Sequence, residues 1–168
     1  MEILCSVTAV QQRVQELGRE ITEFYRGKPL TLLALLNGAM FFATDLARAI
    51  DLEMYIDSIS VSSYAGLQSS GRIALRGDCK LPVTGRHLLL VDGVLDTGLT
   101  LTTVADLLRT RGALSVRTCV LAEKMHPRPA EANPADWCGF RLPNRFLVGC
   151  GMDADEQYRQ LPYIAALD

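Results

Sequence analysis

The chain has 168 residues, of which 49% are hydrophobic and 21% charged, and its formal net charge is −2. This balance is typical of an ordinary globular protein and excludes a disordered tail or a collagen-like repeat. A protein that binds nucleic acid through its phosphates usually has a surplus of basic residues, and this chain has none. We therefore expect no nucleic-acid partner.

The cysteines and the N-terminal region bear on the cellular setting. The five cysteines are odd in number and form no C-x-x-C pair, which favours neither a disulfide framework nor a zinc site. Gln11, Gln12 and Arg13 interrupt any early apolar run, so no signal peptide is expected. No apolar segment approaches the roughly 18 residues needed to span a bilayer. The sequence predicts a cytoplasmic protein without a membrane partner, folded as one domain over residues 1–168.

Helical and strand-like segments alternate in the first half of the chain. From about Thr8 to Tyr25, apolar residues recur at three- and four-residue steps, which predicts one apolar helical face. The run TLLALL, residues 31–36, suits a strand buried on both faces. A helix is expected over 40–50 and a second strand over 54–64. The polar stretch 65–85 is expected to form a long loop or hairpin.

The second half continues the alternation. The run HLLLVD, residues 87–92, predicts another buried strand, and residues 100–111 predict a helix that Gly112 ends. Further strands are expected over 116–124 and, as the last clear one, over 145–149. Strands that alternate with helices in this order predict an α/β fold, with a doubly wound, mostly parallel sheet and a small hood or flap.

The segment that follows the strand at 87–92 carries the clearest chemical signal. Its turn, Asp96-Thr97-Gly98-Leu99-Thr100, leads directly into a helix. Ligands of open α/β sheets gather at the carboxyl ends of the strands. A phosphate would find here a glycine that permits close backbone approach, two threonine hydroxyls and the free N–H groups of a helix start. The alternative is an ordinary turn in which Asp and Thr only cap the helix.

This stretch resembles the phosphoribosyl pyrophosphate (PRPP) motif of type I phosphoribosyltransferases, in which two acidic and two apolar residues precede x-T-G-x-T. The hypoxanthine-guanine and xanthine branches of that superfamily have Asp at x, as Asp96 is here. The resemblance implies a purine-salvage transferase that converts hypoxanthine or guanine and PRPP into IMP or GMP and pyrophosphate, with Mg²⁺ as cofactor. Asp96 would be the general base. PRPP and its 5′-phosphate would be bound by Asp92, Asp96, Thr97, Gly98, Leu99 and Thr100.

One position departs from the motif, since Gly93 stands where the family has its second acidic residue. A ribose hydroxyl would then lose a partner, at a cost on the order of 1 kcal/mol. On this basis Gly93→Asp is expected to tighten PRPP binding. The departure also leaves open a non-catalytic or regulatory protein of the same fold that binds nucleotide or PRPP. A third alternative is an RNA-binding regulator, against which the acidic net charge and Asp96 in place of Tyr both argue.

The resemblance extends across almost the whole chain and implies further roles. In LLNGAMFF, a loop that often contains a non-proline cis peptide would bind pyrophosphate through backbone amides; the plain alternative is an Asn-Gly turn. A Ser-Tyr pair would belong to a mobile loop that closes over the reaction centre, unless it is ordinary surface loop. These assignments give Leu36, Asn37, Gly38, Arg159 and, more weakly, Arg128 to pyrophosphate, and Ser63 and Tyr64 to the mobile loop.

A purine site is implied by the strand ending at Lys124 and by the C-terminal run NRFLVGCGMDADEQYRQLPYI. Lys124 would donate to the 6-oxo group, although Glu123 beside it could make it a routine surface charge. Phe146 would stack on the base, unless it is a core residue. The resemblance further implies a homodimer or homotetramer, purine contacts from Lys124, Phe146, Leu147 and Asp153, and metal binding by Asp92 and Asp153. Structural or surface roles are expected for His87 and His126, because neither lies in a metal-ligand spacing.

Overall fold

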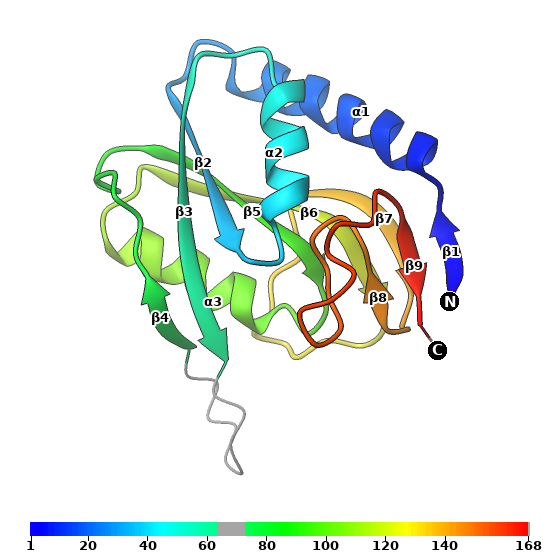
Figure 1. Cartoon of the computed structure of the whole chain (residues 1–168). Coiled ribbons are helices and arrows are strands. Elements are labelled where there is room, and N and C mark those ends of the chain that lie inside the picture. Colours follow the sequence, from blue (N-terminus) through cyan, green and yellow to red (C-terminus); the bar gives the residue numbers. More distant parts are fainter. Residues whose placement is uncertain (64–72, 168) are drawn as a thin grey trace.

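A computed structural model describes residues 1–63 and 73–167 and contains two sheets (Figure 1). The larger sheet has six strands in the order β4-β3-β2-β5-β6-β7, all parallel except β4. No helix of the described residues is long and apolar enough to cross a membrane. The elements are β1 (Glu2–Cys5), α1 (Val7–Tyr25), β2 (Leu30–Leu36), α2 (Met40–Ala49), β3 (Met54–Ser63), β4 (Ile73–Gly77), β5 (His87–Leu95), α3 (Leu99–Thr110), β6 (Ser115–Met125), β7 (Trp137–Pro143), β8 (Leu147–Val148) and β9 (Ile164–Ala166).

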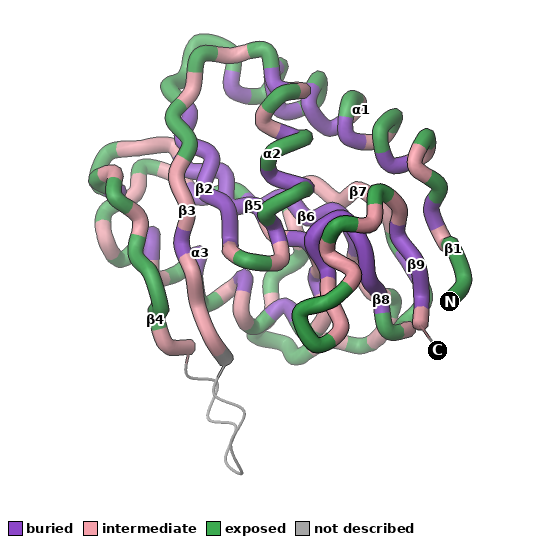
Figure 2. The backbone as a smooth tube through the Cα atoms, viewed as in Figure 1, coloured by how far each residue is buried: buried purple, intermediate pink, exposed green. Residues whose placement is uncertain are grey.

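Helices cover both faces of the larger sheet, which explains why its central strands are continuous apolar runs. Along β5, Leu89 and Val91 pack in one core with α1 and α2, whereas Leu88 and Leu90 pack in a second core with α3. Figure 2 shows the buried residues concentrated in these strands and on the inner sides of the helices. The expected doubly wound, mostly parallel sheet is confirmed, and the segment 65–85 does contain a hairpin strand, β4.

The C-terminal part differs from the expectation. Residues 145–149 do not extend the parallel sheet, because only β8 forms there and it pairs antiparallel with β9 in a small sheet, β1-β9-β8. This sheet brings the two chain ends together (Figure 1). The sixth strand of the larger sheet is β7, which the sequence did not suggest. It is a half-exposed edge strand without an apolar run, and α1 covers it through Arg13, which donates to the carbonyls of Cys138 and Gly139 at 3.0 and 3.1 Å.

A buried hydroxyl at the end of α1 gives a first testable prediction. The Tyr25 ring is fully buried against Phe24 and Trp137, with ring centroids 4.9 and 6.1 Å apart, and its hydroxyl has no hydrogen-bond partner among residues 1–63 and 73–167. Burying a hydroxyl without a partner costs about 1–3 kcal/mol. We expect Tyr25→Phe to raise the free energy of unfolding by about 1 kcal/mol in urea titrations. A lower value for the variant would contradict this account.

Candidate active site

A cleft of about 260 Å³ lies at the carboxyl ends of β5 and β6. A smaller hollow of about 130 Å³ adjoins it at the start of α3, and both are lined by Asp92, Val94 and Asp96. The sequence segments that meet here are far apart along the chain but close at this edge of the sheet (Figure 1). The larger cleft is lined by Gly38, Asp92, Gly93, Val94, Asp96, Lys124, Phe146, Leu147, Met152 and Asp153.

The turn into α3 leaves the helix start without a side-chain cap. Its N-cap is Gly98, whose φ of 80° is in the left-handed region that favours glycine. Thr97 Oγ1 accepts only a long hydrogen bond, 3.4 Å, from the Leu99 amide. The alternative that Asp96 caps the helix is therefore wrong. Thr97, Gly98 and Thr100 line the smaller hollow, where the helix N–H groups could meet an anion.

The carboxylate of Asp96 lies between two donors from the end of β6. Lys124 Nζ is 2.8 Å from Oδ2, and His126 Nε2 is 2.8 Å from Oδ1. Partial burial raises the pKa of the Asp96 carboxyl, but the hydrogen bonds and charges of Lys124 and His126 outweigh it and hold that pKa below the usual aspartate range. His126 was expected in a structural or surface role, and its ring contacts the Asp96 carboxylate directly.

Arg128 braces this turn. Its guanidinium donates to the Asp96 carbonyl at 3.0 Å, to the Lys124 carbonyl at 2.8 Å and to Glu123 Oε1 at 2.8 Å. Glu123 therefore pairs with Arg128, and the ion pair of Lys124 is with Asp96. Three protein acceptors hold the Arg128 side chain in this turn, and its predicted binding of pyrophosphate stays a prediction.

The loop after β2 packs tightly against two glycines. The Leu36–Asn37 peptide bond is cis. A Cβ atom built on Gly93 would lie 2.8 Å from the Gly38 carbonyl oxygen, and one built on Gly151 would also collide with it. Gly93 is thus the residue that lets this loop reach the strand end. The expectation that Gly93→Asp improves PRPP binding conflicts with this packing, because the loop would have to move.

Asp92 is partly buried near the end of β5 beside the same loop. Its Oδ1 accepts from the Gly93 amide at 2.7 Å and lies 3.7 Å from where a Cβ on Gly38 would stand. Desolvation raises the pKa of the Asp92 carboxyl to about 7, although the hydrogen bond from Gly93 acts in the opposite direction. The carboxyl thus changes charge near neutral pH in the free protein.

This pKa predicts how stability depends on pH. The folded state keeps the Asp92 proton up to about pH 7, whereas an unfolded aspartate releases it near pH 4. The folded state therefore binds more protons between these values, so this group lowers the free energy of unfolding as pH rises from 4 to 7, by an amount on the order of a few kcal/mol. We expect Asp92→Asn to flatten that decline in urea titrations at pH 4.5 and 7.5. An equal decline in both proteins would contradict the assignment.

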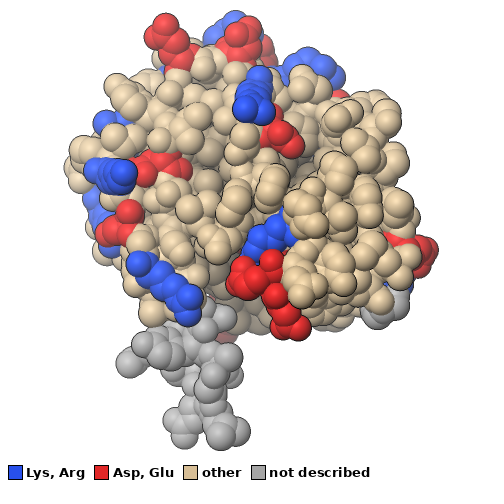
Figure 3. Space-filling view, in the orientation of Figure 1, with Lys and Arg blue, Asp and Glu red and all other residues tan. Residues whose placement is uncertain are grey.

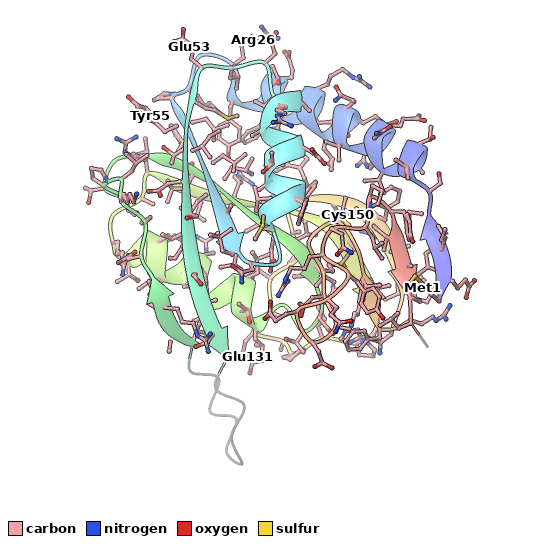
Figure 4. All side chains as sticks on the ribbon, viewed as in Figure 1. Met1, Arg26, Glu53, Tyr55, Glu131 and Cys150 are labelled. Carbon is pink, nitrogen blue, oxygen red and sulfur yellow. The ribbon has the colours of Figure 1, made fainter. Side chains whose placement is uncertain are left out.

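The opposite wall of the cleft comes from the C-terminal segment. Phe146 is 51% exposed and lines the cleft, so it is not a core residue. Asp153 Oδ1 is 2.9 Å from Arg159 Nη1, which also donates to the Gly151 carbonyl at 2.7 Å. Arg159 is anchored further by Glu156 at 2.8 Å. Figure 4 labels Cys150 in this segment, close to the start of α2.

The first of the two residues predicted for the mobile loop, Ser63, lines neither hollow. Ser63 is the last residue of β3 and pairs with Ile73 of β4. Tyr64 lies outside the described residues, so the mobile-loop assignment of this pair stays a prediction.

On the face shown in Figure 3, acidic and basic side chains are interspersed, without a broad surface of one sign.

Larger clefts lie elsewhere in the described part of the chain. One, of about 480 Å³, is formed by α1, α2 and residues 160–162, a second, of about 630 Å³, lies between α2 and the β2–β3 strands, and a third, of about 330 Å³, lies between α3 and residues 133–136. The first two are lined mainly by apolar residues, and the third has one carboxylate, Asp136, in its lining. The 260 Å³ cleft combines three carboxylates, an ammonium and an exposed aromatic ring, so its chemistry and not its volume marks it as the candidate site.

Comparisons with known proteins show the family and the fold. Residues 6–155 match the family model of the phosphoribosyl transferase domain. The chain is 42% identical to the hypoxanthine-guanine phosphoribosyltransferase of Mycobacterium avium, over 99% of this chain and 85% of that protein. It is 38% identical to the hypoxanthine-guanine-xanthine phosphoribosyltransferase of Tritrichomonas foetus, over 98% and 90%. The crystal structure of a hypoxanthine phosphoribosyltransferase from Staphylococcus aureus superposes with a TM-score of 0.94 and 35% identity, covering 100% of this chain and 91% of that one.

Proposed function

This chain belongs to the hypoxanthine-guanine phosphoribosyltransferase family, and from this premise we propose that it is a purine-salvage enzyme that joins a 6-oxopurine to the ribose 5-phosphate of PRPP. The observation that carries the proposal is that two hollows meet at Asp96. One has the features of a phosphate cradle, and the other has those of a site for a flat base. A sugar bound between them would have its C1′ beside the carboxylate.

The base would lie in the larger cleft. Lys124 donates only, so its ammonium would favour a 6-oxo group and disfavour a 6-amino group, whose own N–H groups would face it. The exposed ring of Phe146 would stack on the purine. The Leu147 backbone would meet the purine 2-position, which supports hypoxanthine and guanine as substrates without ranking them.

PRPP would lie across both hollows. Thr97, Gly98 and Thr100 would hold the 5′-phosphate at the start of α3. Asp92 would meet a ribose hydroxyl from the end of β5. The Leu36–Gly38 loop, which brings Gly38 to the wall of the cleft, would hold the pyrophosphate, with Arg159 as its cationic partner.

Magnesium fits the residues of this cleft. Mg²⁺ is usually held by one or two carboxylates together with substrate phosphates, and not by an all-protein cage. Asp92 and Asp153 both line the cleft, and no group of three or more potential ligands occurs among the described residues. We propose that these two aspartates face the ion. When bound, it neutralises charge on the departing pyrophosphate.

In the transfer step the purine nitrogen would form a bond to C1′ while the bond from C1′ to the pyrophosphate oxygen breaks. The electron pair of the broken bond would leave with pyrophosphate. The purine N–H proton would pass to Asp96. The family resemblance implies positive charge on C1′ in the transition state, which nearby carboxylates would stabilise.

A screen of hypoxanthine, guanine and xanthine with PRPP and Mg²⁺, followed by ultraviolet absorbance, tests the proposal. We expect turnover with at least one of the first two bases. Calorimetric binding of GMP or IMP without turnover of any base would favour the alternative, a non-catalytic or regulatory binder of this fold. We further propose that residues 1–168 form one domain. We also propose that two or four copies of the chain assemble, and light scattering would measure the mass of that assembly.

A further inference from the structure

The His126 ring lies between two acceptors. Its Nδ1 is 2.8 Å from the Pro127 carbonyl oxygen, and its Nε2 is 2.8 Å from Asp96 Oδ1. A carbonyl oxygen can only accept, and so can an ionised carboxylate, whereas a neutral imidazole has a single N–H group. If both contacts are hydrogen bonds, His126 and Asp96 together hold one proton more than a neutral histidine beside an ionised aspartate would.

The surrounding charges decide where that proton lies. The Lys124 ammonium contacts Asp96 Oδ2 and favours an ionised carboxylate. Arg128 reaches the Asp96 carbonyl, while its own charge is paired with Glu123. The other carboxyl groups of the cleft are Asp92 and Asp153. Because the Lys124 ammonium on Oδ2 keeps the Asp96 carboxylate ionised, the extra proton belongs to His126, which is therefore an imidazolium at Oδ1.

The chain geometry makes this contact specific. Lys124 lies in β6, and His126 is the first residue after the strand, where the chain bends and the His126 amide donates to the Lys124 carbonyl at 3.2 Å. The two side chains reach the same carboxylate, one on each oxygen. The side chain of His126 is only 19% exposed, whereas that of Asp96 is 48% exposed and would otherwise be free to rotate in water.

We propose that His126 is a positioning residue for Asp96: its imidazolium holds Oδ1 and so leaves Oδ2 as the oxygen that receives the purine proton. This inference rests on the proposed function. Lys124 holds Oδ2 in the free protein and would move to the 6-oxo group when the base binds. The purine N–H bond then breaks, an O–H bond forms at Oδ2, and His126 keeps both of its protons throughout.

Two variants test the role by kinetics. His126→Ala removes the donor, and we expect kcat to fall about 10-fold or more while the KM values for hypoxanthine and PRPP change less than about threefold. His126→Gln keeps a neutral amide donor, so it should recover most of kcat at neutral pH. Because an amide cannot lose a proton, the pH profile of His126→Gln should lack any dependence that the imidazolium contributes in the wild type. His87→Gln is the matched control, because that histidine contacts Ser115 at the far end of β5.

A spectroscopic readout is independent of activity. The chain has only two histidines, so long-range ¹H–¹⁵N spectra of the imidazoles can be assigned with the two glutamine variants. We expect both nitrogens of His126 to carry protons at neutral pH in the wild type. A single protonated nitrogen would overturn the imidazolium assignment.

The outcomes separate the two proposals. If the wild type turns over no oxopurine, both the function and the role of His126 fail. If the wild type is active and both His126 variants match it in kcat and in pH profile, only the positioning role fails. Should His126→Ala not fold, as judged by circular dichroism and GMP binding, the pH profile of His126→Gln decides the question.

Discussion

Replacing Asp96 by asparagine is expected to lower kcat by about 100-fold or more. The amide cannot take up the purine proton, and removal of a positioned general base typically costs 10² to 10⁴ in rate. The amide oxygen can still accept from Lys124 or His126, so substrate binding should be affected less than turnover. Steady-state kinetics with hypoxanthine and PRPP would measure both effects.

The chain offers a matched control for this variant. Asp106 of α3 also pairs with a cation, Arg109, at 2.7 Å, but it is exposed and lies outside both hollows. Asp106→Asn should leave kcat unchanged. Because the Asp96 side chain is about half exposed, Asp96→Asn should unfold at nearly the wild-type temperature. Full turnover by a folded Asp96→Asn enzyme would mean that another group takes the proton.

The parts of the fold that the sequence predicted are those with strong periodicity. The strand at 87–92 and the helix that ends at Tyr25 have apolar patterns that are compatible with few other structures, and the structure contains both, as β5 and α1. The strand β7 was missed because its side chains are half exposed and its edge carbonyls depend on Arg13, more than 120 residues earlier in the chain. Such a long-range contact leaves no local pattern.

In the candidate site, too, some residues could be identified from the sequence and others could not. Residues of the PRPP motif and the purine segment were identified because they resemble the motifs of a known family, and most of them line the two adjoining hollows. His126 was missed because histidines were judged by metal-ligand spacing, whereas its partner lies 30 residues earlier. Its position two residues after Lys124 on a strand end was the available signal. Residue type alone could not show that the Arg128 guanidinium donates to the carbonyls of Asp96 and Lys124.

Gly93 gives the second large effect, and its sign is opposite to that expected from sequence. Gly93→Asp should raise the KM for PRPP, by about 10-fold or more, because its Cβ would stand 2.8 Å from the Gly38 carbonyl oxygen and displace the proposed pyrophosphate loop. Forcing atoms into a packed site typically costs 1–3 kcal/mol. The free energy of unfolding should fall by a similar amount.

Gly93→Ala separates packing from charge, since it adds the colliding atom without a carboxylate. We expect it to raise the KM for PRPP almost as much as Gly93→Asp does. Gly77→Asp is the control, because a Cβ there would meet only Ser60 Cβ, at an ordinary 3.7 Å. A lower KM for Gly93→Asp alone would show that the loop yields and that the added carboxylate binds the ribose. Higher KM values for both Gly93 variants would show that the glycine is needed for the loop to approach β5.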